Sequence, residues 1–405
     1  MGRRNHSISI CFFEDDQCSH FHPLTLTRPM DDLRIGMYTI REKWLYELKS
    51  DSFMRTGRPE LKDLFPSERN SGNNVFWINS RLLPDARIID QILNLSGGEF
   101  IASGEVPLAF RTDDATTGVW LDKGIRAEGF RKTEAAATPP LLEQLWDLLK
   151  YNPDEIERDI DRTDGLNRLK PDAGTGIYIT GRQPVYTGAD VTIEPGVSFV
   201  TSGGPVYIGT GATIMAGSAI RGPAVICRGS TVKMGAKIYG NSTVGPVCKI
   251  GGEINNVIFH SYSNKAHDGY AGNSIFGQWC NLGADTNTSN LKNNYGTIRF
   301  TDWHTRRERN TGELFLGTVM ADHSKTGINS MLNTGTSCGV CCNLFSHGYP
   351  PKLIPSFSWV NSEDISVYLF DKALQTMKRT MARRDVVMSD SYAGMMRKLF
   401  DNRIT

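Results

Sequence analysis

The sequence predicts two architectures in one chain, an α/β domain over residues 1–165 and a parallel β-helix of hexapeptide repeats over residues 191–360. Three observations lead to this fold class. Apolar segments alternate with helical patterns in the first part of the chain, an aliphatic residue recurs at every sixth position in the middle, and amphipathic helical patterns close it. At 405 residues, the chain is long for one hydrophobic core, which also favours two or more domains.

The hexapeptide pattern is the strongest of these signals. Two columns run in register, one of aliphatic residues and one of small residues four positions further on. The aliphatic column is Ile208, Ile214, Ile220, Ile226, Val232, Ile238, Val244 and Ile250, and the small column is Ala212, Ser218, Ala224, Ser230, Ala236, Ser242 and Cys248. The periods of an amphipathic helix and of a half-buried strand fit neither column. A solenoid fits both, because one column fills the interior and the other lets the backbone turn a corner.

The segments before the repeat alternate between strand and helix patterns. The predicted strands are Ser7–Phe13, Asn74–Asn79 and Gly104–Phe110, and the predicted helices are Asp31–Leu48, Leu141–Leu149 and Asp154–Asp161. This alternation is typical of an α/β layer domain. Residues 166–190 contain proline and several glycines and predict a linker. Residues 361–405 predict a helical segment with helices at Glu363–Arg383 and Ser391–Asn402.

Composition narrows the class of function. Lys and Arg number 45 against 44 Asp and Glu, so no overall field favours nucleic acid or an anionic membrane as a partner. No apolar run approaches the roughly 18 residues of a membrane span, and no signal-peptide pattern is present, so we expect a cytoplasmic protein. The eight cysteines have an ordinary density and are interpreted as reduced core thiols.

Two clusters of cysteine and histidine leave a metal or redox site open as an alternative. They are Cys338, Cys341 and Cys342 with His347, and Cys11 and Cys18 with His20 and His22. The first cluster has no second pair at zinc-finger spacing, and the second straddles a strand end and a turn. We therefore interpret the residues of both clusters as structural. Whether the protein binds a metal stays unknown from the sequence.

Two short motifs follow the first predicted strand, Pro23-Leu24-Thr25 and Arg28-Pro29. Their order resembles the opening of the sugar-phosphate nucleotidyltransferases, in which a glycine-rich loop, an arginine, Pro-Leu-Thr and Pro-Lys hold the nucleotide. The resemblance implies nucleotide-binding roles for Thr25 and Arg28 and allows Mg²⁺ as a cofactor.

Three positions depart from that pattern. Glu14-Asp15-Asp16 replaces the glycine-rich loop, Met30 stands in place of the lysine, and Asn79 stands in place of a metal-binding aspartate. Backbone N–H groups and a positive field cradle phosphates, and uncompensated carboxylates repel them. We therefore expect weak or absent nucleotidyl transfer unless Mg²⁺ bridges the acidic cluster. The alternative is a domain retained for sugar-nucleotide binding or as a scaffold.

Residues 251–296 leave the strict repeat and become dense in Asn, Ser and Thr, which suits a sugar ring with many hydroxyls. With its Lys-Ala-His-Asp-Gly-Tyr and Asn-Leu-Gly-Ala segments, the stretch resembles the acetyltransferase half of the bifunctional glucosamine-1-phosphate acetyltransferase/N-acetylglucosamine-1-phosphate uridylyltransferase family. Together with the N-terminal motifs, the resemblance covers most of residues 8–345. It implies a left-handed β-helix, acetyl transfer from acetyl-CoA to an amino sugar 1-phosphate such as glucosamine 1-phosphate, and a homotrimer with sites shared between neighbours.

The resemblance also implies roles for single residues. His267 would be the catalytic base, and Asn290 would orient both the acceptor amine and the cofactor. The positions implied for the sugar phosphate are Lys237, Glu253, Asn255, Tyr270 and Asn281, and those implied for acetyl-CoA are Ala284 and Ser324. Lys237 replaces a family arginine and Asn255 a family lysine, so the phosphate would meet altered geometry and one cation fewer.

Structural alternatives accompany these assignments. His267 would otherwise be an exposed turn residue, Glu253 a surface charge, and Asn281 one rung of an asparagine ladder. The basic residues 306–309, in a predicted insertion loop over Thr297–Thr311, would hold the diphosphate of coenzyme A or be solvated. The charge at residues 379–384 is interpreted as solvated surface.

For the whole chain, two other functions stay open. One is a non-catalytic sugar-nucleotide sensor or scaffold. The other is a nucleotidyltransferase whose β-helix serves only to form trimers.

Overall fold

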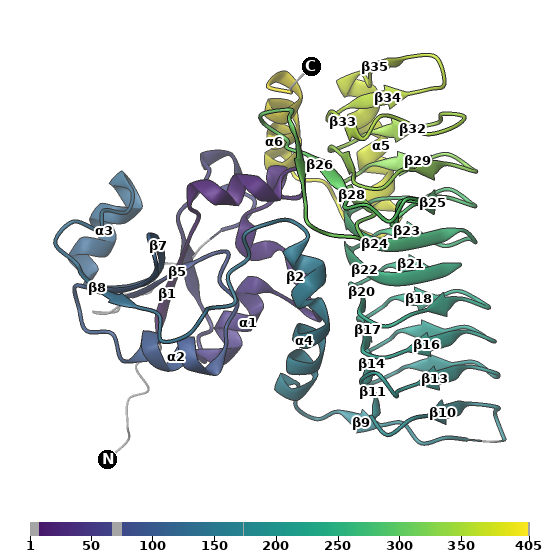
Figure 1. Cartoon of the computed structure of the whole chain (residues 1–405), viewed down its shortest axis with the longest axis horizontal. Coiled ribbons are helices and arrows are strands. Elements are labelled where there is room, and N and C mark those ends of the chain that lie inside the picture. The colour runs from purple at the N-terminus through teal and green to yellow at the C-terminus, as the bar shows by residue number, and fades with distance from the viewer. Residues whose placement is uncertain (1–7, 67–74, 173, 404–405) are drawn as a thin grey trace. The chain divides into compact units, whose positions relative to one another are not determined.

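The computed structural model describes residues 8–66, 75–172 and 174–403 (Figure 1). By their contacts these residues form two compact units. The first contains the residues up to Phe21, Arg28–Leu33 and Tyr38–Leu145, and the second contains His22–Thr27, Arg34–Met37 and the residues from Trp146 onward.

The first unit is built on a sheet with the strand order β4-β1-β5-β7-β6-β8. Its strands are β1 (Ser9–Phe13), β4 (Phe53–Arg55), β5 (Val75–Asn79), β6 (Glu99–Ser103), β7 (Val106–Thr112) and β8 (Arg131–Glu134). β1 pairs in parallel with β4 and β5, and β7 runs antiparallel to β5 and β6. Strands β1, β5 and β7 confirm the three predicted strands. The predicted first residues Ser7 and Asn74 lie outside the described residues.

Aromatic side chains fill the core on one side of this sheet. Trp77 of β5 and Phe110 of β7 each have a ring centroid 5.2 Å from that of Trp120, in edge-to-face geometry. Such aromatic pairs add about 0.5–1.5 kcal/mol beyond the area they bury. Trp120 lies on α3 (Asp114–Lys123), which is thereby anchored to the sheet.

The predicted helix over residues 31–48 is wrong in its first half. Only α1 (Ile40–Glu47) is α-helical, and it is preceded by short strands β2 (Arg34–Ile35) and β3 (Tyr38–Thr39). Gly36 adopts a φ of 63°, which interrupts any helix, and Thr39 and Glu42 form a capping box that starts a new one. The other short elements of this region are α2 (Ala86–Leu93) and the 3-10 helices Asp16–Phe21, Leu24–Leu26, Met30–Asp32 and Pro59–Leu61.

The helix predicted at residues 141–149 is wrong over residues 141–146, and the remainder joins the one predicted at 154–161 in a single helix, α4 (Asp147–Arg162), which includes Pro153. α4 contacts strands β17, β20, β22 and β24 of the second unit. Asn152 helps to fix it there, because its amide nitrogen donates to the carbonyl of Asn241 at 2.8 Å and its amide oxygen accepts from Thr243 at 3.0 Å. By contacts, the first unit therefore ends at Leu145, earlier than the expected boundary at residue 165.

The second unit is a parallel β-helix with three faces, of the expected left-handed type (Figure 1). The first face contains β10 (Tyr178–Thr180), β13 (Ser198–Val200), β16 (Ala219–Arg221) and β19 (Lys237–Ile238). The second contains β11 (Val185–Thr187), β14 (Val206–Ile208), β17 (Ala224–Ile226) and β20 (Ser242–Val244). The third contains β12 (Thr192–Ile193), β15 (Thr213–Ile214), β18 (Thr231–Val232), β21 (Lys249–Ile250) and β23 (Asn264–Lys265).

Two long strands join the first and second faces. β22 (Glu253–Ser261) pairs with both β19 and β20, and β24 (Tyr270–Gln278) pairs with β22 along its length. The later coils contain β25 (Asn287–Thr288), β28 (Thr318–Met320), β29 (Lys325–Thr326), β30 (Met331–Leu332), β31 (Thr336–Cys338), β32 (Asn343–Leu344), β33 (Leu353–Ile354) and β34 (Ser358–Val360). The structure thus confirms the predicted fold class.

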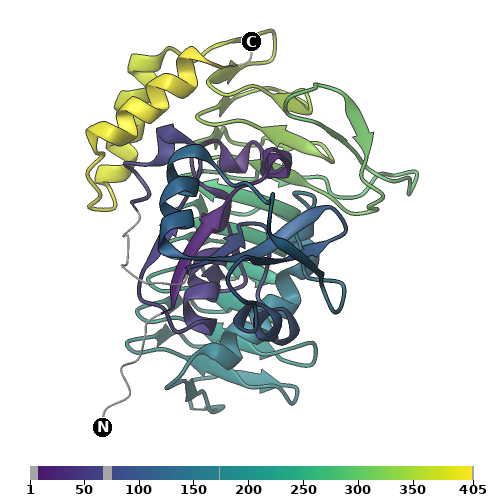
Figure 2. The ribbon, with the colours of Figure 1, turned by 90° about the vertical axis from the view of Figure 1, so that its left-hand side faces the viewer.

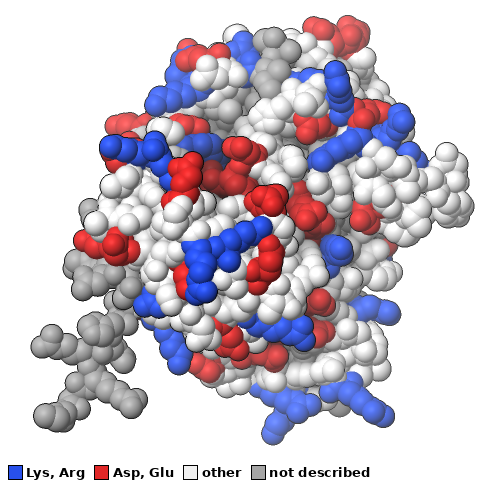
Figure 3. All heavy atoms as spheres, turned by 60° about the vertical axis from the view of Figure 1, so that its left-hand side comes forward, with Lys and Arg blue, Asp and Glu red and all other residues white. Residues whose placement is uncertain are grey.

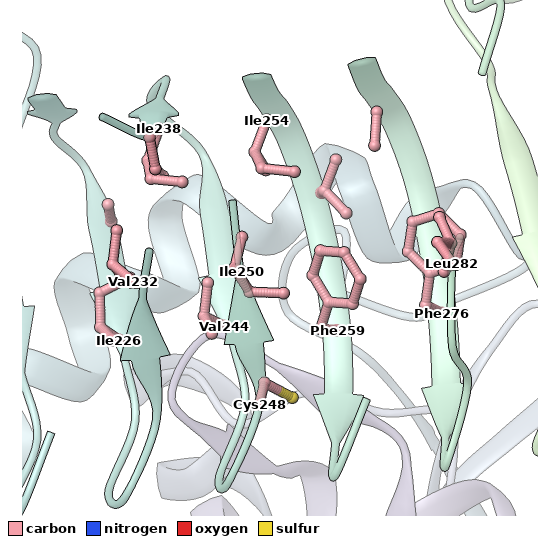
Figure 4. Packing of buried hydrophobic residues seen from close by; sticks show 14 of the residues in the cluster. Ile226, Val232, Ile238, Val244, Cys248, Ile250, Ile254, Phe259, Phe276 and Leu282 are labelled. Atoms are coloured by element: carbon pink, nitrogen blue, oxygen red, sulfur yellow. The ribbon is translucent and has the colours of Figure 1, made fainter. Parts of the chain in front are cut away.

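The aliphatic column fills the interior, where Figure 4 shows Ile226, Val232, Ile238, Val244 and Ile250 pointing into the space between the faces. Every residue of the column is at most 2% exposed. The small column is buried as well, and its hydroxyls bond successive coils. Ser218 donates to the carbonyl of Lys233 at 2.9 Å, and Ser230 donates to that of Gly245 at 2.8 Å.

The β-helix is longer than its regular sequence columns. Strands β9 (Asn167–Arg168), β10 and β11 lie within residues 166–190, which the sequence predicted as a linker. At the other end, β35 (Ile365–Val367) pairs antiparallel with β34 before α5 (Phe370–Ala382) and α6 (Asp390–Asp401). Figure 2 shows these two C-terminal helices side by side, in yellow.

Charges of both signs are interspersed on the face drawn in Figure 3, without a large area of one sign. Within the described residues, no helix is both long and apolar enough to cross a membrane.

Candidate functional site

A cavity of about 590 Å³ lies on the third face of the β-helix, and we call it the corner cavity. Its lining includes Lys249, Tyr262, Asn264, His267, Trp279, Asn281, Ala284, Lys325, Thr380, Arg383 and Arg384. A second cavity of about 400 Å³, the side cavity, shares Ala266, His267 and Ala284 with it. The exposed His267 is thus the one predicted catalytic side chain that lines both cavities.

The turn that carries His267 is fixed from both sides. The buried amine of Lys265 donates to the backbone carbonyls of His267 and Asp268, both at 3.1 Å. Gly269 has a φ of 107°, and a Cβ there would lie 2.4 Å from the carbonyl oxygen of Thr286. A larger residue would therefore collide with the next coil, which explains the glycine between His267 and Tyr270.

A row of polar side chains runs across the first face, one coil after another. Lys237 is the register partner of Glu253, and Glu253 is the partner of Tyr270. The amide nitrogen of Asn290 donates to the Tyr270 hydroxyl at 3.1 Å. Burial raises the pKa of Tyr270, although hydrogen bonds from Asn255 and Asn290 partly offset this, so the phenol keeps its proton at neutral pH. We call these five residues the polar row.

Asn281 lies in the corner cavity, apart from the polar row. Its side-chain oxygen accepts from Asn264 at 3.4 Å, so the two asparagines form adjacent rungs on successive coils. Ser324 is fully buried, donates to the carbonyl of Gly339 at 2.6 Å and accepts from the amide of Cys342 at 2.9 Å. Its hydroxyl therefore holds two coils together, and Ser324 is not part of the lining of the corner cavity or the side cavity, so its expected contact with acetyl-CoA stays a prediction.

Apart from Ser324, the structure thus divides the predicted β-helix residues into two groups. His267, Asn281 and Ala284 line the corner cavity, and the five residues of the polar row lie on the first face. Sequence reasoning missed the cations and aromatic residues that complete the cavity, Lys249, Tyr262, Trp279, Lys325, Arg383 and Arg384. Arg383 and Arg384 stand at the end of a predicted helix, where the sequence predicts solvated surface charge.

The predicted insertion loop forms the hairpin of β26 (Arg299–Thr301) and β27 (Glu308–Asn310). Arg306 lies over Trp303 with 5.6 Å to the ring centroid, and Arg309 lies over Trp146 with 5.0 Å. Burial lowers the pKa of both arginines. Two of the basic side chains expected at coenzyme A or in solvent are therefore packed on the chain's own aromatic rings.

All eight cysteines are buried and free. Burial raises the pKa of Cys341 to about 12, so this thiol stays protonated. Over residues 8–66, 75–172 and 174–403, no group of three or more His, Cys, Asp or Glu side chains could hold a metal ion.

The first unit has its own cavity of about 590 Å³, the N-terminal cavity. Its lining includes Glu14, Pro29, Arg55, Arg58, Lys62, Phe65, Trp120 and Asp122. It combines cations with aromatic rings, which are the groups that bind the phosphates and base of a nucleotide. Arg58, Lys62, Phe65 and Trp120 were not among the residues predicted from the sequence.

The expectation that the acidic cluster is uncompensated is wrong for two of its three residues, Glu14 and Asp15. Asp15 accepts two hydrogen bonds from Arg81, at 2.9 and 2.6 Å, and Glu14 pairs with Arg58 at 3.1 Å. Asn79, in place of an aspartate, donates to Asp15 at 2.8 Å. Because these carboxylates are paired with cations, Glu14 and Asp15 do not present a bare negative charge to phosphates.

The two nucleotide-binding residues predicted from the sequence are both buried. Arg28 is 2% exposed and pairs with Asp32 at 3.1 Å, and its carbonyl accepts from Arg58 at 2.7 Å. The backbone carbonyl of Arg28 thus helps to hold the Arg58 guanidinium in place. Thr25 is 1% exposed and belongs to the second unit.

Residues 10–165 match the family model described as sugar nucleotidyl transferase. The N-terminal part is therefore a domain of sugar nucleotidyl transferase type, which indicates a transferase in nucleotide-sugar biosynthesis. No curated protein matches the chain. Among solved structures, UDP-N-acetylglucosamine acyltransferase from Campylobacter jejuni matches with 14% identity and a TM-score of 0.24, over 56% of this chain and 96% of that one.

Proposed function

We propose that the β-helix transfers the acetyl group of acetyl-CoA to the amine of an amino sugar 1-phosphate such as glucosamine 1-phosphate. The observation that carries this proposal is the position of His267. It is exposed, lines both the corner cavity and the side cavity, and lies three residues before Tyr270 of the polar row. A base in this position can serve a donor on one side and an acceptor on the other.

In this reaction the acceptor amine attacks the thioester carbon, a C–N bond forms and the C–S bond breaks. The imidazole of His267 accepts the proton that the amine loses and passes it to the departing coenzyme A sulfur. The polar row holds the acceptor: the Tyr270 hydroxyl and the Asn290 amide meet its hydroxyls, and Lys237 meets its phosphate.

His267→Ala tests the proposal directly. Since a positioned general base is worth about 10²–10⁴ in rate, acetyl transfer to glucosamine 1-phosphate should fall by that factor while the melting temperature stays unchanged. His347→Ala, at another exposed histidine, is the matched control and should keep the parent rate. If His267→Ala transfers acetyl within a few-fold of the parent, the catalytic assignment fails and His267 is a turn residue.

For the first unit we propose nucleotidyl transfer to a sugar 1-phosphate, with the N-terminal cavity as the nucleotide site. The family match and the pairing of Glu14 with Arg58 and of Asp15 with Arg81 support it, because they remove the charge repulsion expected from the sequence.

Pyrophosphate release from UTP and N-acetylglucosamine 1-phosphate, with and without Mg²⁺, tests this activity. Lys62→Ala removes an exposed cation of the cavity and should lower the rate about tenfold, since charge-assisted hydrogen bonds are worth about 1.5–3 kcal/mol. Arg87→Ala, at an exposed cation on α2, should have no effect. A chain that releases no pyrophosphate under either condition would contradict the proposal and favour a scaffold domain.

A further inference from the structure

Four cations of the corner cavity have no counter-charge. They are Lys249, Lys325, Arg383 and Arg384, and within the described part of the chain no carboxylate lies within ion-pair distance of any of them. The positive charge of Arg384, followed by burial, lowers the pKa of Lys249, and Arg383 adds to the effect, so these three cations are close enough to repel one another. Like charges gathered without partners in a cavity destabilise the free protein and favour an anionic ligand.

The arginines reach the cavity from the C-terminal segment. Arg383 is the C-cap of α5 and Arg384 follows it. Arg384 donates to the side-chain oxygen of Asn264 at 2.8 Å, which ties the end of α5 to β23. That bond uses one of the five N–H donors of the guanidinium, so others remain for a ligand.

Aromatic side chains at one corner of the β-helix form another wall of the corner cavity. One corner of the β-helix has positive φ on successive coils: it is glycine at Gly211 and Gly229, Val247 in the next coil, and then Tyr262, Trp279 and His323, with φ of 54°, 61° and 62°. Their rings stack, with centroids 4.3 Å apart for the first pair and 6.0 Å for the second.

A bulky residue in the left-handed conformation costs about 1–2 kcal/mol relative to a relaxed backbone, and glycine avoids this cost. Tyr262 and Trp279 line the corner cavity; Trp279 is buried, and the half-buried ring of Tyr262 offers the aromatic surface that suits the base of a nucleotide.

We propose that the corner cavity binds the phosphorylated nucleotide end of the acyl donor, with Arg383, Arg384 and Lys249 on its phosphates and Tyr262 beside its base. This rests on the proposed acetyl transfer. The cavity volume, about 590 Å³, falls within the range of about 300–1,000 Å³ for small-ligand sites. The acceptor phosphate is assigned elsewhere, because the polar row with Lys237 lies on the first face of the β-helix and none of its residues belongs to the lining of the corner cavity.

Adenosine 3′,5′-bisphosphate is the probe, because it carries the phosphates and base of this end without the thioester. Its dissociation constant is measured by calorimetry on the full chain. Arg383→Ala and Arg384→Ala should each weaken binding about tenfold, and adenosine without phosphates should bind the parent and both variants equally weakly. Arg379→Ala is the matched control, an exposed arginine on the same helix that is not part of the cavity lining.

The aromatic wall is tested by Tyr262→Gly, which removes the ring and relaxes the backbone. It should weaken the bisphosphate about tenfold by loss of base stacking, whereas Val247→Gly, at the same corner one coil earlier with a φ of 60°, should not. Melting temperatures identify any variant that fails to fold.

Acetyl transfer from acetyl-pantetheine, which lacks the nucleotide, separates this inference from the proposed function. If both are right, Arg384→Ala raises the KM for acetyl-CoA but leaves transfer from acetyl-pantetheine unchanged. If the parent binds the bisphosphate through these arginines but transfers no acetyl group, the proposed acetyltransferase activity is refuted. The inferred nucleotide site then still stands. Unchanged bisphosphate binding in the double arginine variant, or loss of glucosamine 1-phosphate binding instead, overturns the inference.

Discussion

The amine of Lys265 donates to the carbonyl of His267 at 3.1 Å, from a side chain that is fully buried beneath the turn. Lys265 thus positions the proposed base through its backbone without contacting the substrate. Burial lowers the pKa of this amine to about 8, and the charges of Asp268 and Asp285 offset part of the effect.

A pH dependence of stability follows from that pKa. The folded pKa of about 8 lies below the ordinary value of 10.5, so the unfolded chain binds more protons between these values. The free energy of unfolding of the parent, relative to Lys265→Met, should therefore rise as the pH increases from about 8 toward 10.5. Urea denaturation of both proteins at several pH values measures it. A difference that stays flat over this window would show that Lys265 is not charged and buried as described.

Tyr270→Phe removes the hydroxyl that accepts from Asn290 in the polar row. We expect the KM for the amino sugar 1-phosphate to rise about tenfold, because one hydrogen bond to the acceptor is lost and the Asn290 amide loses a partner. The KM for acetyl-CoA should stay at the parent value. Steady-state kinetics with each substrate varied in turn measures the two KM values separately. A change in the KM for acetyl-CoA alone would assign Tyr270 to the donor site.

Arg81→Met should destabilise the first unit by about 3 kcal/mol, since removing one partner of a buried ion pair leaves a carboxylate uncompensated. Burial raises the pKa of Asp15, but the hydrogen bonds and charge of Arg81 outweigh burial and hold the pKa below its usual value. The contribution of the pair is therefore present above pH 3.8 and lost as the pH falls below it. Urea unfolding of the full chain tests the prediction. Arg87→Met, on the exposed side of α2, is the control, and equal stability of the two variants would contradict it.

Two exposed apolar side chains flank the cavities that contain His267. Met234 is 71% exposed in the side cavity, and Ile328 is 74% exposed in the corner cavity. We predict a homotrimer in which a neighbouring copy covers them, as exposed apolar surface beside a site favours an interface. Light scattering should give a trimer for the parent and smaller species for Met234→Glu with Ile328→Glu. Val387→Glu, at a residue that is 92% exposed between α5 and α6, should remain trimeric, and a monomeric parent would refute the prediction.

The sequence predicted elements best where one periodic signal was repeated. The β-helix was recognisable because every sixth residue is aliphatic, and β1, β5 and β7 because they are continuous apolar runs. The irregular coil that contains β10 and β11 was not predicted, because strands of two or three residues in a single coil show no repeating period. The helix over residues 31–48 was overextended because Gly36 and the Thr39 cap interrupt an otherwise plausible pattern.

The sequence by itself determined the two-domain architecture, the interior columns and the candidacy of His267, because each depends on local periodicity or on neighbours along the chain. Only the tertiary structure decided what lies around those residues. It paired Asp15 with Arg81, buried Ser324 between coils, and brought Arg384 to Asn264 across 120 positions. Charge compensation and cavity lining depend on distances of a few ångströms between residues far apart in the chain, and no spacing in the sequence encodes those distances.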